Sequence, residues 1–174
     1  NKISRVIVST DSPEIARVAN LFNAETPFLR PEQLSDDTSS EWLAWRHALN
    51  YLKNNEKTMP ECLLSLPTTS PLRDNIDINK CFSHYETNAY DSVITVKKSS
   101  RNPEFNMIKK KPSDNYELAI NKNIKYKRRQ DAPIYYDITT VAYIVKSSLI
   151  MEKESIFDGK IGVVEIPEER AIDI

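Results

Sequence analysis

The residues best able to do chemistry follow a short apolar run, Leu63 to Leu66, which is typical of a buried strand. Two prolines, Pro67 and Pro71, then fix the backbone and cannot continue a strand. Between them lie three hydroxyl residues, Thr68, Thr69 and Ser70. In open α/β sheets, ligands bind just beyond the carboxyl ends of the strands. The loop is therefore a candidate binding site, and the alternative is an ordinary connection to a helix capped by Asp74.

A second candidate is Arg30, which lies between Pro27 and Pro31. The proline that follows disfavours helix at Arg30, so we predict an extended segment that holds this arginine more firmly than an open surface would. The alternative is a solvated loop charge. The two histidines, His47 and His84, have no second ligand at metal spacing, which predicts that there is no zinc site.

The elements that must position these residues alternate between strand and helix. Apolar and β-branched runs predict strands at residues 3–8, 63–66 and 92–96. Apolar residues at helical spacing predict three amphipathic helices between these strands. The order β-α-β-α-β predicts a parallel sheet. The apolar faces of the predicted helices are Ile15, Val18, Ala19 and Phe22; Trp42, Trp45, Leu49 and Leu52; and Ile78, Phe82 and Tyr85.

The pattern changes between residues 97 and 131, where the chain becomes polar and basic. Two candidate strands flank a turn signature at residues 112–115, which predicts a hairpin arm inserted into the domain. The α/β core is then divided into a first part, 1–96, and a second part, 132–174, around the arm. The lysines of the arm could attract nucleic acid, but the scarcity of aromatic stacking residues favours a solvated face.

Composition excludes several classes of function. The 174 residues carry 24 Lys and Arg against 25 Asp and Glu, so net charge does not point to nucleic acid or an anionic membrane. No apolar run approaches the roughly 20 residues of a membrane span, and the start is not a signal peptide, which predicts a cytoplasmic protein. The only two glycines, Gly159 and Gly162, exclude a glycine-rich phosphate loop. Because the chain opens without Met, almost directly in a strand, we expect that an upstream part has been left out.

Eight short motifs occur in order along nearly the whole chain, which resembles the acylneuraminate (CMP-sialic acid) cytidylyltransferase family. Each motif is weak alone, but the ordered set is specific. The resemblance implies a Rossmann-like α/β nucleotide-sugar transferase fold, a mostly parallel sheet flanked by helices, with an inserted arm that builds a homodimer. The motifs are Val8-Ser9-Thr10-Asp11, Phe28-Leu29-Arg30-Pro31, Asp37-Thr38-Ser39-Ser40, Thr69-Ser70-Pro71-Leu72-Arg73, Asp91-Ser92-Val93, Arg101-Asn102-Pro103, Arg128-Arg129-Gln130-Asp131, and Pro167-Glu168-Glu169-Arg170 with Ile172-Asp173-Ile174.

The resemblance also implies a reaction. The anomeric hydroxyl of a nonulosonic acid, a nine-carbon 2-keto sugar acid, attacks the α-phosphate of CTP with Mg²⁺ and gives CMP-sugar and pyrophosphate. Such a transfer depends on positioning and on stabilising charge at phosphate oxygens. The implied nucleotide contacts are Arg30 and Ser39, and the implied Mg²⁺ ligand is Asp173. No catalytic residue is assigned, and the implied contacts on the sugar side are Thr69, Ser70, Arg73, Arg129, Gln130 and Tyr143.

The chain departs from the family pattern in three places. The family's glycine-rich loop has no counterpart, and its second acidic metal ligand would fall beyond Ile174. Pro67 and the pair Thr139-Thr140 stand where many members have Gln and Asn-Gly, so the identity of the sugar stays open. We therefore expect the chain as given to be nearly inactive. The alternative function is a non-catalytic fragment that dimerises or binds sugar or nucleotide.

Overall fold

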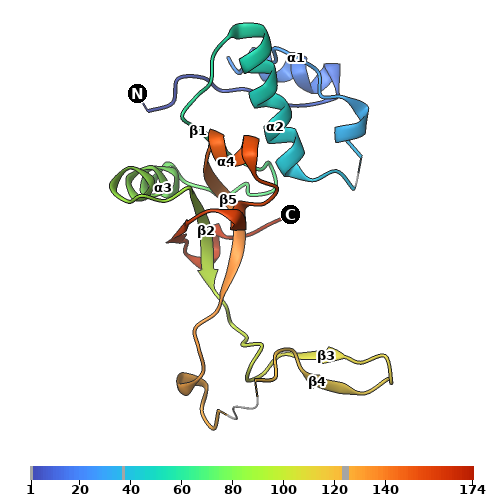
Figure 1. The fold of residues 1–174 in the computed structure, drawn as a ribbon, viewed down its shortest axis with the longest axis vertical. Helices are drawn as coiled ribbons and strands as arrows, with labels where there is room; N and C mark the ends of the chain where they lie inside the picture. The colour runs from blue at the N-terminus through green and yellow to red at the C-terminus, as the bar shows by residue number, and fades with distance from the viewer. Residues whose placement is uncertain (1, 37, 123–125) are drawn as a thin grey trace. The chain divides into compact units, whose positions relative to one another are not determined.

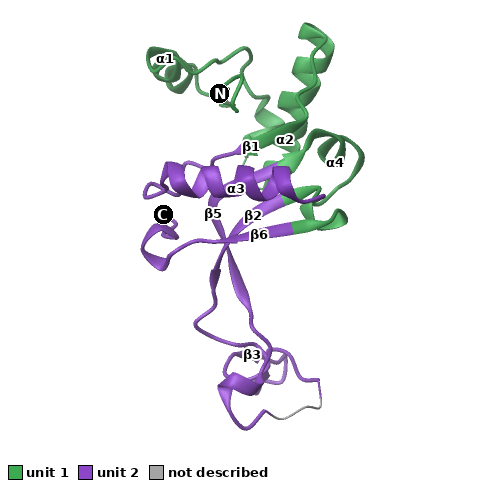
Figure 2. Cartoon of the chain, turned by 90° about the vertical axis from the view of Figure 1, so that its left-hand side faces the viewer, with its two compact units in different colours: residues 1–64, 90–92, 145–161 green, residues 65–89, 93–144, 162–174 purple. Residues whose placement is uncertain are grey.

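The computed structural model describes residues 2–36, 38–122 and 126–174. The chain forms two compact units, which Figure 2 colours separately. Unit 1 comprises residues 1–64, 90–92 and 145–161, and unit 2 comprises residues 65–89, 93–144 and 162–174. In the part of the chain that is described, no helix has the length and apolar character needed to cross a membrane.

The helices and strands follow one another along the chain as Figure 1 shows. The α-helices are α1 (Pro13–Leu21), α2 (Glu41–Tyr51), α3 (Asn75–Thr87) and α4 (Ser147–Glu152). The strands are β1 (Cys62–Ser65), β2 (Ser92–Lys98), β3 (Ile108–Lys110), β4 (Tyr116–Leu118), β5 (Tyr136–Lys146) and β6 (Ile161–Glu165). Short 3-10 turns lie at Glu32–Leu34, Arg129–Asp131, Ile156–Asp158 and Glu168–Arg170, and a π-helical turn, Leu52–Glu56, extends α2.

Helix α1 begins as predicted but does not bury its apolar face. The hydroxyl of Ser12 caps it by accepting from the backbone N–H of Ile15 at 3.3 Å, and a proline occupies the first turn. However, Ile15 is 54% exposed and Phe22 80% exposed, and the helix buries only Ala16. The predicted strand at residues 3–8 is also wrong, because its described pairing is a single parallel bridge between Ile7 and Glu25.

Helix α2 packs against α4 within unit 1, and its apolar stripe is core as predicted. Leu49 is 1% exposed and Trp42 is 8% exposed. The indole N–H of Trp42 donates to the carbonyl of Lys153 at 3.0 Å, so this large side chain is buried without an unsatisfied donor.

The main sheet has the strand order β1-β5-β2-β6. Strands β2 and β6 are parallel, because Asp91 donates to the carbonyl of Lys160 at one end (2.8 Å) and Ile166 donates to the carbonyl of Val96 at the other (2.7 Å). Each pair of residues lies at corresponding ends of the two strands. These strands confirm the predicted parallel arrangement for part of the sheet.

Strand β5 runs antiparallel to β2, so the sheet is mixed, and its antiparallel strand lies outside the part of the chain for which the β-α-β-α-β order predicted parallel strands. Lys146, at the end of β5, donates to the carbonyl of Asp91, just before β2 (2.9 Å), and Ser99, just after β2, donates to the carbonyl of Tyr135, just before β5 (2.9 Å). The physical reason is the connection. The arm returns the chain to the end of the sheet that it left, whereas a parallel strand needs a crossover to the opposite end.

The arm contains the predicted hairpin. Strands β3 and β4 pair antiparallel with Ile108 opposite Leu118 (Figure 1). At the base of the arm, the nearly buried carboxylate of Glu104 accepts from Lys122 Nζ at 2.7 Å, from the Tyr126 hydroxyl at 3.3 Å and from the Tyr135 hydroxyl. Residues 123–125 of the predicted arm lie outside the described residues. The predicted division at residues 96 and 131 and the predicted homodimer stay predictions.

Candidate active site

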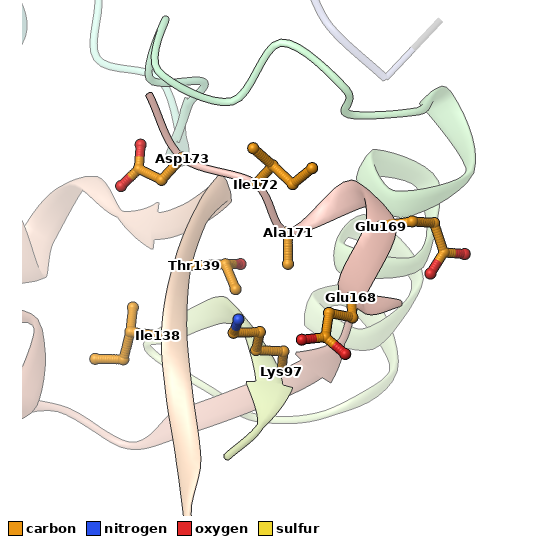
Figure 3. Close-up of a pocket in the computed structure, with 8 residues that line it drawn as sticks. All are labelled: Lys97, Ile138, Thr139, Glu168, Glu169, Ala171, Ile172 and Asp173. Carbon is orange, nitrogen blue, oxygen red and sulfur yellow. The ribbon is translucent and has the colours of Figure 1, made fainter. Parts of the chain in front are cut away.

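Unit 2 carries a pocket of about 760 Å³, which is within the usual size range of small-molecule sites. Its walls come from the end of β2, the first half of β5 and the tail that follows β6 (Figure 3). Several of its residues are polar or charged, and the tail supplies an exposed carboxylate, Asp173. The residues that line it include Lys97, Ile138, Thr139, Glu168, Ile172 and Asp173.

The predicted loop after β1 and the predicted metal ligand come together here. The backbone N–H of Ile174 donates to the carbonyl of Thr69 at 3.0 Å, which ties the residue after Asp173 to the loop. The hydroxyls of Ser70 and Thr140 lie 2.6 Å apart, and Ser70 is 3% exposed. Ser70 therefore uses its side chain to fasten the loop to β5.

Arg73, predicted as a contact on the sugar side, bonds to backbone carbonyls and so stabilises the same loop. Its guanidinium donates to the carbonyl of Pro67, and the carbonyl of Thr140 lies 3.5 Å from the same nitrogen. Burial lowers the pKa of Arg73. Its Nε has no hydrogen-bond partner among the described residues. In this structure, Arg73 shapes the loop by holding backbone carbonyls.

The pair Thr139-Thr140 uses both of its hydroxyls inside the protein. The hydroxyl of Thr139 donates to that of Thr95 at 2.8 Å, and Thr95 is fully buried in β2. The Thr95 hydroxyl also accepts from the backbone N–H of Ala142 at 3.1 Å. The hydroxyl of Thr139 therefore has a partner inside the protein, although Thr139 lines the pocket.

An ion pair that the sequence analysis missed holds the tail against α3. Asp77 is fully buried, and its two carboxylate oxygens each accept from the Arg170 guanidinium at 2.8 Å. These bonds lower the pKa of Asp77. Asp77 also completes a capping box with Asp74, which confirms Asp74 as the helix cap. The capping-box spacing could have drawn attention to Asp77, and Arg170 belongs to one of the eight motifs, but no local pattern pairs the two residues.

None of the six residues predicted on the sugar side is among those that line the pocket. Arg129 and Gln130 lie exposed in the 3-10 turn at Arg129–Asp131, and the Arg129 guanidinium donates to the carbonyl of Ser100 at 3.0 Å. Tyr143 is half-buried on β5. Their assignment as substrate contacts stays a prediction.

The two predicted nucleotide contacts belong to unit 1. Arg30 is anchored by its backbone N–H to the carbonyl of Thr10 at 2.8 Å, and its Nε donates to the Ser35 hydroxyl at 3.2 Å. The Ser39 hydroxyl lies 2.9 Å from the Asp36 carboxylate. Hydrogen bonds, from Thr38 first and then from Ser39, lower the pKa of Asp36. Asp37, in the same predicted motif, lies outside the described residues.

The carboxylate of Asp173 fits a magnesium ion whose other oxygen ligands come from substrate phosphates and water. Among the described residues, no group of three or more His, Cys, Asp or Glu side chains could hold a metal ion. Mg²⁺ is usually bound by one or two carboxylates together with substrate phosphates and water. Asp173 lines the pocket and offers one such oxygen ligand.

Solved structures with the same fold include two enzymes that handle cytidine nucleotides. One is 4-diphosphocytidyl-2C-methyl-D-erythritol synthase from Anaerococcus prevotii, with a TM-score of 0.64 and 14% identity over 99% of this chain and 76% of that one. The other is CMP:2-keto-3-deoxy-manno-octonic acid synthetase in complex with CTP, with a TM-score of 0.61 and 13% identity over 94% of this chain and 73% of that one. At this identity the likeness establishes the fold alone.

Sequence relatives cover nearly all of the chain. It is 33% identical to the CMP-N,N'-diacetyllegionaminic acid synthase of Campylobacter jejuni and 31% identical to post-translational flagellin modification protein B of Campylobacter coli, over 97% of this chain and 71% of each relative. It is 26% identical to the N-acylneuraminate cytidylyltransferase of Escherichia coli, over 98% of this chain and 39% of that protein. Residues 1–167 match the family described as cytidylyltransferase. The chain belongs to this cytidylyltransferase family and is a nucleotidyltransferase, as its ordered motifs predicted.

Proposed function

We propose that this chain transfers CMP from CTP to a nonulosonic acid. The observation that carries the proposal is the similarity over at least 97% of the chain to proteins named as CMP-legionaminic acid synthase and N-acylneuraminate cytidylyltransferase. In the proposed reaction, the anomeric oxygen of the sugar acid forms a bond to the α-phosphorus. The bond from that phosphorus to the β-phosphate oxygen breaks, pyrophosphate leaves with the electron pair, and the hydroxyl proton passes to solvent.

The pocket of unit 2 is the proposed site for the sugar acid. Apolar groups of Ile138, Ile172 and Thr139 suit the carbon skeleton and acyl substituents of such a sugar. Thr69, Ser70 and Arg73 support the loop beside the tail, and Arg129, Gln130 and Tyr143 keep the contact roles that the family resemblance implies. Arg30 and Ser39 are the proposed contacts to cytidine.

Asp173 is the proposed protein ligand for Mg²⁺, with the phosphates of CTP and water supplying the other oxygens. When bound, the ion would neutralise charge on the phosphate oxygens. The chain's own contribution is to hold the carboxylate in place. It does so through the bond from Ile174 to Thr69 and through the turn that Arg170 fixes to Asp77.

The arm is the proposed dimerisation element. It exposes apolar side chains, among them Ile108 at 63% and Tyr116 at 56%. A two-stranded hairpin with so few apolar residues is not stable alone, and pairing with a second copy would cover them. Analytical ultracentrifugation at micromolar concentration should show a dimer. A monomer with the arm intact would contradict this part of the proposal.

The proposed reaction is tested by pyrophosphate release from CTP and Mg²⁺ with N-acetylneuraminate or a related nonulosonic acid. The assay is run on the protein as the cell makes it and on the 174-residue chain. We expect release from the cellular protein that requires both the sugar acid and CTP. Binding of CTP or sugar acid by both proteins, without release from either, would instead favour the non-catalytic alternative.

A further inference from the structure

Lys97 brings a positive charge into a pocket whose other ionisable lining residues are acidic. It lies near the end of β2, where the buried run Ser92–Val96 stops, and is half-buried. Figure 3 shows its ammonium end directed toward Thr139. Within the described residues, no ion pair joins Lys97 to a carboxylate. The structure therefore presents a cation without a fixed partner inside a candidate binding pocket.

Three arginines of unit 2 already have partners in the protein. Arg170 is bound by Asp77 through two bonds of 2.8 Å, and Arg73 is directed to backbone carbonyls. Arg129 donates to the carbonyl of Ser100 and does not line the pocket. Lys97 is thus the cation best placed to meet an anionic group of a ligand there.

An anionic substrate in this pocket needs such a cation. The carboxylate of a nonulosonic acid would otherwise face Glu168 and Asp173, and like charges in a partly desolvated site repel. We infer that Lys97 binds the carboxylate of the sugar acid and so distinguishes a sugar acid from an uncharged sugar. This inference rests on the proposed function and adds the residue that recognises the carboxylate of the substrate.

Lysine also binds phosphates as a point charge, so a phosphate of CTP is the competing partner for this ammonium. Figure 3 places Lys97 and Asp173 on opposite sides of Thr139. The proposed triphosphate side is the Asp173 side, which the bond from Ile174 ties to Thr69. The side with Lys97 is therefore left for the carboxylate.

The test compares Lys97→Met with Lys98→Met in the complete protein. Lys98 is the next residue of β2, is exposed, and presents its side chain to the other face of the strand, so it is a matched control. The measurements are the KM of the nonulosonic acid that supports turnover, the inhibition constant of its uncharged methyl ester, and the KM of CTP.

Lys97→Met should raise the KM of the acid about ten- to a hundred-fold, the range for a hydrogen bond to a charged group. The inhibition constant of the ester and the KM of CTP should change less than about twofold, because neither depends on the lost charge pair. Lys97→Arg should restore most of the affinity for the acid, and Lys98→Met should leave all three values unchanged. If Lys97→Met does not fold, Lys97→Gln serves in its place.

Several results would overturn the inference. A rise in the KM of CTP alone would make Lys97 a phosphate ligand, and equal losses for acid and ester would make its role structural. If Arg129→Met loses the preference for acid over ester while Lys97→Met keeps it, Arg129 rather than Lys97 binds the carboxylate. If the wild-type protein turns over no nonulosonic acid, the proposed function fails as well. If it does, and Lys97→Met keeps the preference, only the Lys97 assignment fails.

Discussion

The pocket and the arm of unit 2 are both rich in charged residues but are held together differently. Around the pocket, polar groups meet partners far away in the sequence, such as Asp77 with Arg170 and Ser70 with Thr140. In the hairpin, ion pairs such as Lys110 with Asp114 join near neighbours and stay exposed to solvent. The pocket should therefore depend on the whole of unit 2, whereas the hairpin can change without disturbing the pocket.

The largest expected effect follows from breaking the ion pair under the pocket. Arg170→Met would leave the fully buried carboxylate of Asp77 without its cation, and we expect the free energy of unfolding to fall by about 3 kcal/mol. Urea denaturation followed by circular dichroism measures this loss. The matched control is Arg128→Met, which removes an exposed ion pair with Asp131 and should cause no measurable change. Similar losses in the two variants would contradict the contrast between pocket and arm.

The same ion pair predicts how stability depends on pH. Arg170 lowers the pKa of Asp77 below its reference value of 3.8, so the folded state favours the ionised form. Its contribution to stability is complete above the unfolded pKa and is lost as pH falls through the lower folded pKa. The free energy of unfolding, measured in urea from pH 7 to pH 3, should therefore drop at the acid end. In Asp77→Asn the decrease in the free energy of unfolding at acid pH should be smaller, because this carboxylate is absent. If the decrease is the same as in the wild-type protein, other carboxylates cause it.

Much of the local structure around the site could be predicted from the sequence. The apolar run before Pro67 predicted β1, the alternative interpretation of the loop gave Asp74 as a helix cap, and the turn signature at residues 112–115 predicted the hairpin of β3 and β4. Each of these features depends on neighbours within a few residues, where periodicity and turn chemistry act directly.

The features that were missed depend on partners distant in the chain. The pairing of Asp77 with Arg170 joins residues 93 positions apart, and no local pattern marks it. The direction of β5 depends on where the arm returns the chain rather than on the composition of the strand. The apolar spacing of α1 identified a helix correctly but could not tell whether Ile15 and Phe22 meet a partner, and here they are exposed.

An intermediate effect is expected from the arm. Ile108→Asp places a charge at a hairpin position that is 63% exposed, so it should weaken association between copies without disturbing the pocket. Sedimentation equilibrium should show a dissociation constant raised by at least about tenfold, the effect of losing one buried apolar contact of roughly 1.5 kcal/mol. The midpoint temperature of thermal unfolding and the KM of CTP should be nearly unchanged. A variant that unfolds as a whole would show that the hairpin is not independent of the pocket.

The smallest effect concerns Ser70, whose predicted role was a substrate contact. Because its buried hydroxyl lies 2.6 Å from that of Thr140, Ser70→Ala should cost about 1 kcal/mol of stability, the typical worth of one hydrogen bond. The KM of the sugar acid should rise only slightly, since the hydroxyl faces β5. Thr140→Val removes the other partner, and the double variant should lose less stability than the sum of the two single losses, because each single change already breaks the shared bond. The prediction is contradicted if the losses in stability are additive and if Ser70→Ala alone causes a large rise in the KM of the sugar acid. Ser70 would then be a substrate contact, as first predicted. The pocket would also depend less on internal hydrogen bonds than its contacts indicate.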